Sequence, residues 1–93
     1  MREKQIEQRL VHEVKHLDGL CPKWVSPGLA GVPDRIVLLP GGRIAFAELK
    51  APGQMPRPLQ QHRIEQLRQL GFRVYIIDSI NQIGGVLDEI SAT

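Results

Sequence analysis

Hydrophobic residues recur at helical spacing in two stretches of the chain. The first stretch, residues 2–17, predicts an amphipathic helix, and Gly19 lies where that helix should stop. The second, residues 59–70, carries a shorter apolar stripe and is followed by Gly71. The apolar positions are Ile6, Leu10, Val14 and Leu17 in the first stretch, and Ile64, Leu67 and Leu70 in the second.

Other stretches have the pattern of β-strands. Residues 35–39 and 43–49 flank a Pro-Gly-Gly turn and predict a β-hairpin. Residues 72–77 are apolar enough for a central strand, and residues 23–26 predict a short edge strand. The sequence therefore predicts three strands before the second helix and one strand after it.

The rest of the chain completes one α/β domain. Three prolines exclude regular structure in residues 51–58, and residues 81–90 predict a weak last helix because they contain two consecutive glycines. The expected order is α-β-β-β-α-β-α in a single domain of residues 1–93, whose 42% hydrophobic residues suit one core. No apolar run is long enough to span a membrane. The lone cysteine, Cys21, and the charged start of the chain lead us to expect a cytoplasmic protein without a secretory signal.

The predicted hairpin carries two acidic residues and a lysine. Glu48 and Lys50 lie two residues apart on a strand, so their side chains share one face. If the turn is centred on Gly41, Asp34 stands opposite Glu48 and the two carboxylates converge beside the lysine. With a two-residue turn on both glycines, Asp34 pairs with the next residue and the acids face apart. The first register predicts a site for a hard cation such as Mg²⁺, and the second predicts an ordinary exposed ion pair.

Two glutamates fall on the apolar face of the first predicted helix. Glu3 lies at the end of the helix and can reach water, but Glu7 is flanked by apolar side chains and needs a partner. That partner is either a basic residue on the sheet or a metal ion shared with the hairpin carboxylates. The spacing of residues leaves both possibilities open.

His12 and His16 form an H-E-x-x-H pattern, which is typical of zinc proteases. On the same helical wheel, however, both histidines fall on the solvent side. A catalytic zinc also needs a third protein ligand and a sheltered open position. We therefore do not assign a zinc protease to this pattern.

The net charge of +2 is distributed unevenly along the chain. Residues 22–76 contain eight basic and three acidic side chains, and the remaining residues are net acidic. A basic middle favours a polyanionic partner such as nucleic acid, although an ordinary solvated surface gives the same pattern.

The sequence around the hairpin resembles the VRR-NUC (virus-type replication-repair nuclease) domains of the PD-(D/E)XK nuclease superfamily. The P-D…E-x-K pattern is present as Pro33-Asp34 and Glu48-Leu49-Lys50, with 13 residues between the two acids. The supporting strings are Lys23-Trp24-Val25-Ser26-Pro27-Gly28, Gly31-Val32-Pro33-Asp34-Arg35, Phe46-Ala47-Glu48-Leu49-Lys50-Ala51-Pro52-Gly53 and Arg57-Pro58-Leu59-Gln60. The similarity runs from about Glu3 to Ile83, nearly the whole chain.

The resemblance implies a restriction-endonuclease-like fold, an αβββαβ core with a mixed central sheet flanked by helices. It also implies that Asp34 and Glu48 hold Mg²⁺ or Mn²⁺, with the main-chain carbonyl of Leu49 as a further ligand. Lys50 would orient the attacking water and stabilise developing negative charge.

Two further site residues come from the helices. By the resemblance, Glu7 is the first-helix glutamate that joins the catalytic and metal-binding residues, with Glu3 as its competitor. Gln60, at the start of the second helix, would support the water or the scissile phosphate. Gln61 is adjacent but is expected to point elsewhere.

The implied activity is that of a metal-dependent, structure-selective DNA endonuclease. Stand-alone domains of this kind resemble Holliday-junction resolvases, which implies branched DNA as the substrate and a homodimer as the active form. Basic residues that would contact DNA phosphates are Lys23, Arg35, Arg57 and Arg63.

Two other functions are compatible with the basic α/β domain. One is a non-catalytic module that binds double-stranded nucleic acid, since such modules share an αβββα order and a basic surface. The other is a small scaffold that recruits a replication enzyme. Neither needs carboxylates that converge beside a lysine, and neither should depend on a divalent cation.

Overall fold

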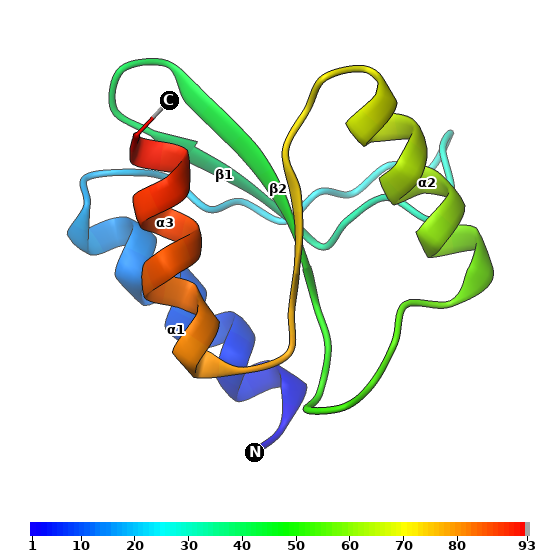
Figure 1. The fold of residues 1–93 in the computed structure, drawn as a ribbon, viewed down its shortest axis with the longest axis horizontal. Helices are drawn as coiled ribbons and strands as arrows, with labels where there is room; N and C mark the ends of the chain where they lie inside the picture. Colours follow the sequence, from blue (N-terminus) through cyan, green and yellow to red (C-terminus); the bar gives the residue numbers. More distant parts are fainter. Residues whose placement is uncertain (93) are drawn as a thin grey trace.

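The structure, a computed structural model that describes residues 1–92, is a three-stranded sheet with helices on both faces. In Figure 1, α1 and α3 lie on one side of the strands and α2 lies on the other. The elements are α1 (Glu3–His16), β1 (Arg35–Leu39), β2 (Arg43–Leu49), α2 (Pro58–Gln69), β3 (Val74–Ile77), the 3₁₀ turn η1 (Ile80–Gln82) and α3 (Ile83–Ser91). None of the helices in this part of the chain is long and apolar enough to cross a membrane.

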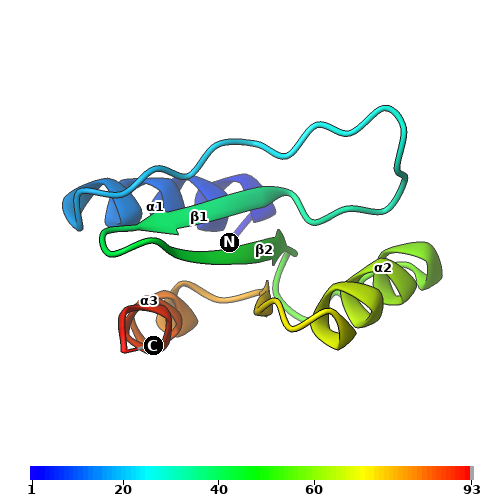
Figure 2. The same ribbon diagram turned by 90° about the horizontal axis from the view of Figure 1, so that it is seen from above.

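The sheet is mixed, as the resemblance implied. β2 lies in the centre, antiparallel to β1 and parallel to β3. The parallel pair requires a crossover, and α2 supplies it, as Figure 2 shows from above. The predicted α/β fold with an αβββαβ order is thus confirmed, apart from the first predicted strand.

The first predicted strand, residues 23–26, is replaced by two isolated bridges to β1. Leu20 bridges to Leu38 and Lys23 bridges to Arg35. Pro22 stands between them and has no backbone N–H to donate, so a continuous ladder cannot form. The Pro22 carbonyl still accepts a hydrogen bond of 3.0 Å from Ile36 N–H, and the segment covers the outer edge of β1.

The β1–β2 hairpin turns through the three residues 40–42. Leu39 pairs with Arg43 and Arg35 pairs with Ala47, so Gly41 is the centre of the turn. Gly41 and Gly42 have φ angles of +88° and +75°, a backbone conformation that other residues adopt only with strain. This is the register that brings Asp34 and Glu48 to opposite positions.

The core divides into two clusters, one on each face of the sheet. The larger cluster packs α1 and α3 against the strands, where Ala45 and Ala47 of β2 leave room for close approach. The smaller cluster packs Ile64 and Leu67 of α2 against Phe46 and Val74. Since Ala47 and Leu49 join the larger cluster, Glu48 between them points to the opposite face, which carries α2.

Element boundaries differ slightly from those expected. α2 begins at Pro58, because proline is well suited to the first turn of a helix. The last helix is preceded by a 3₁₀ turn, at which the Ser79 hydroxyl accepts a hydrogen bond of 3.2 Å from Asn81 N–H. The strand predicted over residues 72–77 is shortened to Val74–Ile77.

Candidate active site

Asp34 lies immediately before β1, directly across from Glu48 in the hairpin register. Its carboxylate Oδ2 accepts a hydrogen bond of 2.9 Å from the backbone N–H of Leu49. Its main-chain carbonyl accepts another, also of 2.9 Å, from Trp24 N–H. Asp34 is therefore fixed by both of its neighbouring segments, and its side chain is directed at the end of β2.

Glu48 is a buried carboxylate without a hydrogen-bond donor. The residue is 1% exposed, and no hydrogen bond of acceptable geometry reaches either carboxylate oxygen. Lys50 Nζ lies 3.3 Å from Glu48 Oε2, which is close enough for an ion pair. A buried carboxylate in this state is costly, so the site favours the binding of a proton or a further cation.

The pKa of Glu48 also shows that the charged form of this carboxylate is disfavoured. The pKa of Glu48 is raised from 4.5 to about 7, chiefly by burial and next by the negative charge of Asp34, while the ammonium of Lys50 opposes both effects. A divalent cation between the two carboxylates would remove their repulsion and restore the charged form of Glu48. The donor set therefore fits a hard cation with oxygen ligands, as the sequence predicts.

The protein supplies only part of such a coordination shell. In residues 1–92, no three His, Cys, Asp or Glu side chains gather closely enough to hold a metal ion. Asp34 and Glu48, with the main-chain carbonyl of Leu49 as the predicted third oxygen, would leave several positions to water and substrate. Mg²⁺ commonly binds to one or two carboxylates in this way.

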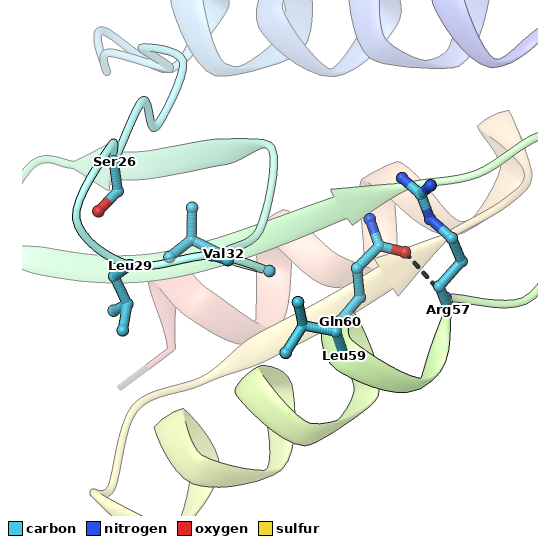
Figure 3. Close-up of a pocket in the computed structure, with 8 residues that line it drawn as sticks. Ser26, Leu29, Val32, Arg57, Leu59 and Gln60 are labelled. Atoms are coloured by element: carbon cyan, nitrogen blue, oxygen red, sulfur yellow. Dashed lines mark hydrogen bonds between the residues drawn. The ribbon is translucent and has the colours of Figure 1, made fainter.

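Gln60 lies in the first turn of α2, beside a depression of about 430 Å³. Its Oε1 accepts a hydrogen bond of 2.8 Å from Arg57 N–H, as Figure 3 shows. Gln61 instead donates from Nε2 to the Pro56 carbonyl at 2.7 Å, so it points elsewhere, as expected. The depression is lined by Ser26, Leu29, Ala30, Gly31, Val32, Arg57, Leu59 and Gln60.

The loop before Asp34 packs directly on the start of α2. Gly31 has a φ angle of +79°, and a Cβ atom at this position would meet the Leu59 carbonyl oxygen at 2.9 Å. Arg63 Nε also donates to the Ala30 carbonyl at 3.0 Å. These contacts fix the position of Gln60 relative to the segment that leads into Asp34.

Glu7 is bound to a basic residue of the sheet. Its Oε2 accepts a hydrogen bond of 2.8 Å from Arg35 Nε, and the two side chains are 22% and 16% exposed. Arg35 Nη1 also donates to the Cys21 carbonyl at 2.8 Å. Glu7 lies on the face that α1 covers, whereas Glu48 points to the other face.

Glu3 is exposed, and it has no side-chain hydrogen bond or ion pair in the described part of the chain. It occupies the first turn of α1. Both ribbon views show this end of α1 beside the end of β2, where Lys50 follows the strand (Figures 1 and 2).

The four basic residues predicted to contact DNA differ in their surroundings. Lys23 and Arg57 are exposed, and the structure of residues 1–92 gives their side chains no hydrogen bond or ion pair. Arg35 is held by Glu7 and Cys21, and Arg63 by Ala30 and Gln66. The side chains of Lys23 and Arg57 are therefore more available to a DNA phosphate than those of Arg35 and Arg63.

The sequence prediction did not include Asp78, which lies at the same end of the strands as Lys50. It directly follows β3, next to the hydrogen bond of 2.9 Å from Lys50 N–H to the Ile77 carbonyl. Its Oδ2 accepts a hydrogen bond of 3.3 Å from Gly53 N–H, which fixes the loop after Lys50. An acidic residue directly after an apolar strand is the sequence signal that points to this position.

A mixed sheet between helices, with Asp34, Glu48 and Lys50 at one end of its hairpin, is the arrangement typical of PD-(D/E)XK-type nucleases. No protein-family profile matches the chain. It is 49% identical over 79 residues to "Putative nuclease p44" of Acyrthosiphon pisum secondary endosymbiont phage 1. The aligned residues make up 85% of each chain. A solved structure described as a VRR_NUC domain superposes with a TM-score of 0.86 at 30% identity, covering 92% of this chain and 94% of the other.

The chain belongs to the VRR-NUC family of nucleases, as its motifs predicted. The fold of this family implies the use of a divalent metal ion.

In the metal-free protein, Glu48→Gln should stabilise the fold at about pH 8 but not at about pH 4. Because the pKa of Glu48 rises from 4.5 to about 7 on folding, the folded state binds more protons than the unfolded chain between these values. Stability therefore falls as the pH rises through this window, by about 3 kcal/mol in total, and glutamine removes the effect. Urea unfolding in EDTA measures the difference.

The matched control for this experiment is Glu65→Gln, at an exposed position on α2. It should leave the free energy of unfolding within about 0.5 kcal/mol of wild type at both pH values. If Glu48→Gln also had the stability of wild type at both pH values, the carboxyl would not be buried without a hydrogen bond as described.

Proposed function

We propose that the protein is a Mg²⁺- or Mn²⁺-dependent, structure-selective endodeoxyribonuclease that cleaves branched DNA such as Holliday junctions. The observation that carries the proposal is the buried carboxylate of Glu48, which has no hydrogen-bond donor, lies across from Asp34 and is 3.3 Å from Lys50 Nζ. A site of this kind has little use in a module that only binds nucleic acid. The cytoplasmic location expected from the sequence stays a prediction.

In the proposed reaction, water attacks phosphorus, the P–O3′ bond breaks, and the products carry a 5′-phosphate and a 3′-hydroxyl. A bound divalent cation supplies positive charge against the charge that develops on the phosphate. Asp34 and Glu48 would hold that cation, with the Leu49 carbonyl as a further ligand. The Lys50 ammonium would orient the attacking water and stabilise the developing negative charge. Gln60 would position the water or the scissile phosphate.

The size of the chain supports action as a homodimer. One copy measures 32 × 31 × 21 Å, which is small for holding two arms of a branched DNA. A two-fold dimer would present two symmetry-related sites to the DNA, as paired incisions require. Lys23 and Arg57 are our first candidates for phosphate contacts beside each site, and the contacts of Arg35 and Arg63 make them weaker candidates.

Asp34→Ala should abolish cleavage and leave DNA binding largely intact. Removal of even an indirect partner of a metal commonly lowers metal affinity or activity by about 10–100-fold, so loss of a direct ligand should cost at least about 100-fold. The assay uses labelled linear duplex, flap, splayed-arm and four-way-junction substrates with Mg²⁺, with Mn²⁺ and with EDTA.

Each outcome of this assay has a separate meaning. Metal-dependent, symmetric incisions in the junction support the whole proposal. Cutting of flaps or plain duplex would keep the nuclease and contradict the junction preference. Undiminished cleavage by Asp34→Ala would contradict the site. Tight binding without any cleavage, with or without metal, would favour the binding module instead.

Lys50→Ala should reduce the cleavage rate at saturating Mg²⁺ and change metal affinity little. Loss of one preorganised charged group at a transition state typically costs about 10²–10³ in kcat. The rate is measured on the preferred substrate, and Mg²⁺ affinity is measured separately by calorimetry. A large loss of metal affinity with a small change in saturated rate would contradict this role for Lys50.

Glu3 and Glu7 should respond differently to alanine. The Arg35 ion pair supports a structural role for Glu7 and leaves Glu3 as our preferred first-helix residue of the site. Glu7→Ala leaves a half-buried guanidinium unpaired and should destabilise the fold by about 1–3 kcal/mol. Glu3→Ala should leave stability unchanged and lower cleavage.

Urea unfolding and cleavage rates for both glutamate variants decide between the two positions. A stable Glu7→Ala protein that loses cleavage and Mg²⁺ binding would restore Glu7 as the metal ligand and reverse our preference.

A further inference from the structure

His12 and His16 lie one turn apart on the exposed face of α1, opposite the buried Ile6, Leu10 and Val14. Their Nε2 atoms are 3.0 Å apart, and their rings meet edge to face with centroids separated by 4.4 Å. In neutral imidazoles this contact requires that one Nε2 donate its hydrogen to the other. Two ring nitrogens therefore already point at one another across one turn of the helix.

This spacing matches that of two imidazoles bound to one metal ion. With metal–nitrogen distances of about 2.0–2.1 Å, two nitrogens 3.0 Å apart subtend an angle of roughly 95° at the metal. An angle near 90° suits octahedral or tetragonal Ni²⁺ and Cu²⁺ better than tetrahedral Zn²⁺. Binding requires that the shared hydrogen move from Nε2 to Nδ1 of the same ring, so that both rings stay neutral, and that the exposed rings rotate until both Nε2 lone pairs face the metal.

The surroundings of the pair leave room for the rest of a coordination shell. The two histidines line a depression of about 420 Å³ together with Lys15 and Asp18. Lys15 and Asp18 add one positive and one negative charge to this depression, so its formal charge is balanced. Since both histidines are exposed, water can fill the remaining positions.

We propose that His12 and His16 form a binding site for a late first-row divalent cation, Ni²⁺ or Cu²⁺, separate from the carboxylates of the hairpin. The two sites differ in ligand type, because imidazole favours these metals and carboxylate oxygen favours Mg²⁺ and Mn²⁺. They also lie on different elements, since the histidines belong to the last two turns of α1 and the carboxylates to the β1–β2 hairpin. Titrations with Ni²⁺ would consequently detect a class of site that Mg²⁺ does not fill.

Isothermal titration calorimetry with NiCl₂, in excess Mg²⁺ to occupy oxygen-ligand sites, tests the proposal. We expect one Ni²⁺ per wild-type chain and a loss of affinity of at least about tenfold in His12→Ala and in His16→Ala. His62→Ala, at an exposed position on α2, is the matched control and should bind as wild type does. Asp34→Ala should also retain the site.

Two further measurements make the result specific to this pair. Circular dichroism should show unchanged thermal midpoints for the metal-free histidine variants and a Ni²⁺-dependent rise only in wild type and in the two controls. Electron paramagnetic resonance of the Cu²⁺ complex should show two equivalent nitrogen ligands. Wild-type affinity in either His12→Ala or His16→Ala, or loss of binding in His62→Ala, would overturn the proposal.

Discussion

The turn at residues 40–42 determines whether the two carboxylates of the proposed site lie on the same face of the sheet. Side chains on a strand alternate between faces, so a shift of one residue in the hairpin would place Asp34 and Glu48 on opposite sides of the sheet. Gly41 and Gly42 adopt positive φ angles that permit the three-residue turn, and the hydrogen bond from Leu49 N–H to the Asp34 carboxylate holds the far end of the hairpin. Backbone conformation at two glycines thus controls the chemistry about seven residues away.

The same register makes the site electrostatically unfavourable without a cation. Alternation turns the buried side chain of Glu48 to the α2 face of the central strand, and pairing with β1 brings a second carboxylate close to it. Lys50 compensates for only one negative charge. The folding energy of the rest of the domain, two apolar clusters on the two faces of the sheet, has to support this arrangement. Such strain at a defined position is expected of functional sites, because charge that is unbalanced before binding favours a ligand of opposite charge.

Much of the fold was predictable from local patterns. The helices around Leu10 and Leu67 and the hairpin have clear periodicity, and their boundaries moved by only a few residues. Three features were not predictable in this way. One is the absence of the first predicted strand. Pro22 prevents a continuous ladder because its missing N–H faces β1, and a local pattern does not show which way that position faces. The turn length could be stated only as two alternatives. The partner of Glu7 is Arg35, which lies 28 positions away in the sequence, and a helical wheel carries no information on such a contact.

The Arg35–Glu7 pair gives Glu7 a structural partner that the resemblance did not imply. The resemblance placed Glu7 beside the catalytic carboxylates, since it stands in the expected helix with apolar neighbours. A glutamate in that position is equally well accounted for by the need of Arg35 for a partner, as its guanidinium is held near Cys21 under α1. Arg35 immediately follows Asp34, so the ion pair fixes the strand at the point where the β1–β2 hairpin begins. In the site that we propose, Glu7 would then position Asp34 through the backbone of Arg35 without itself binding the metal.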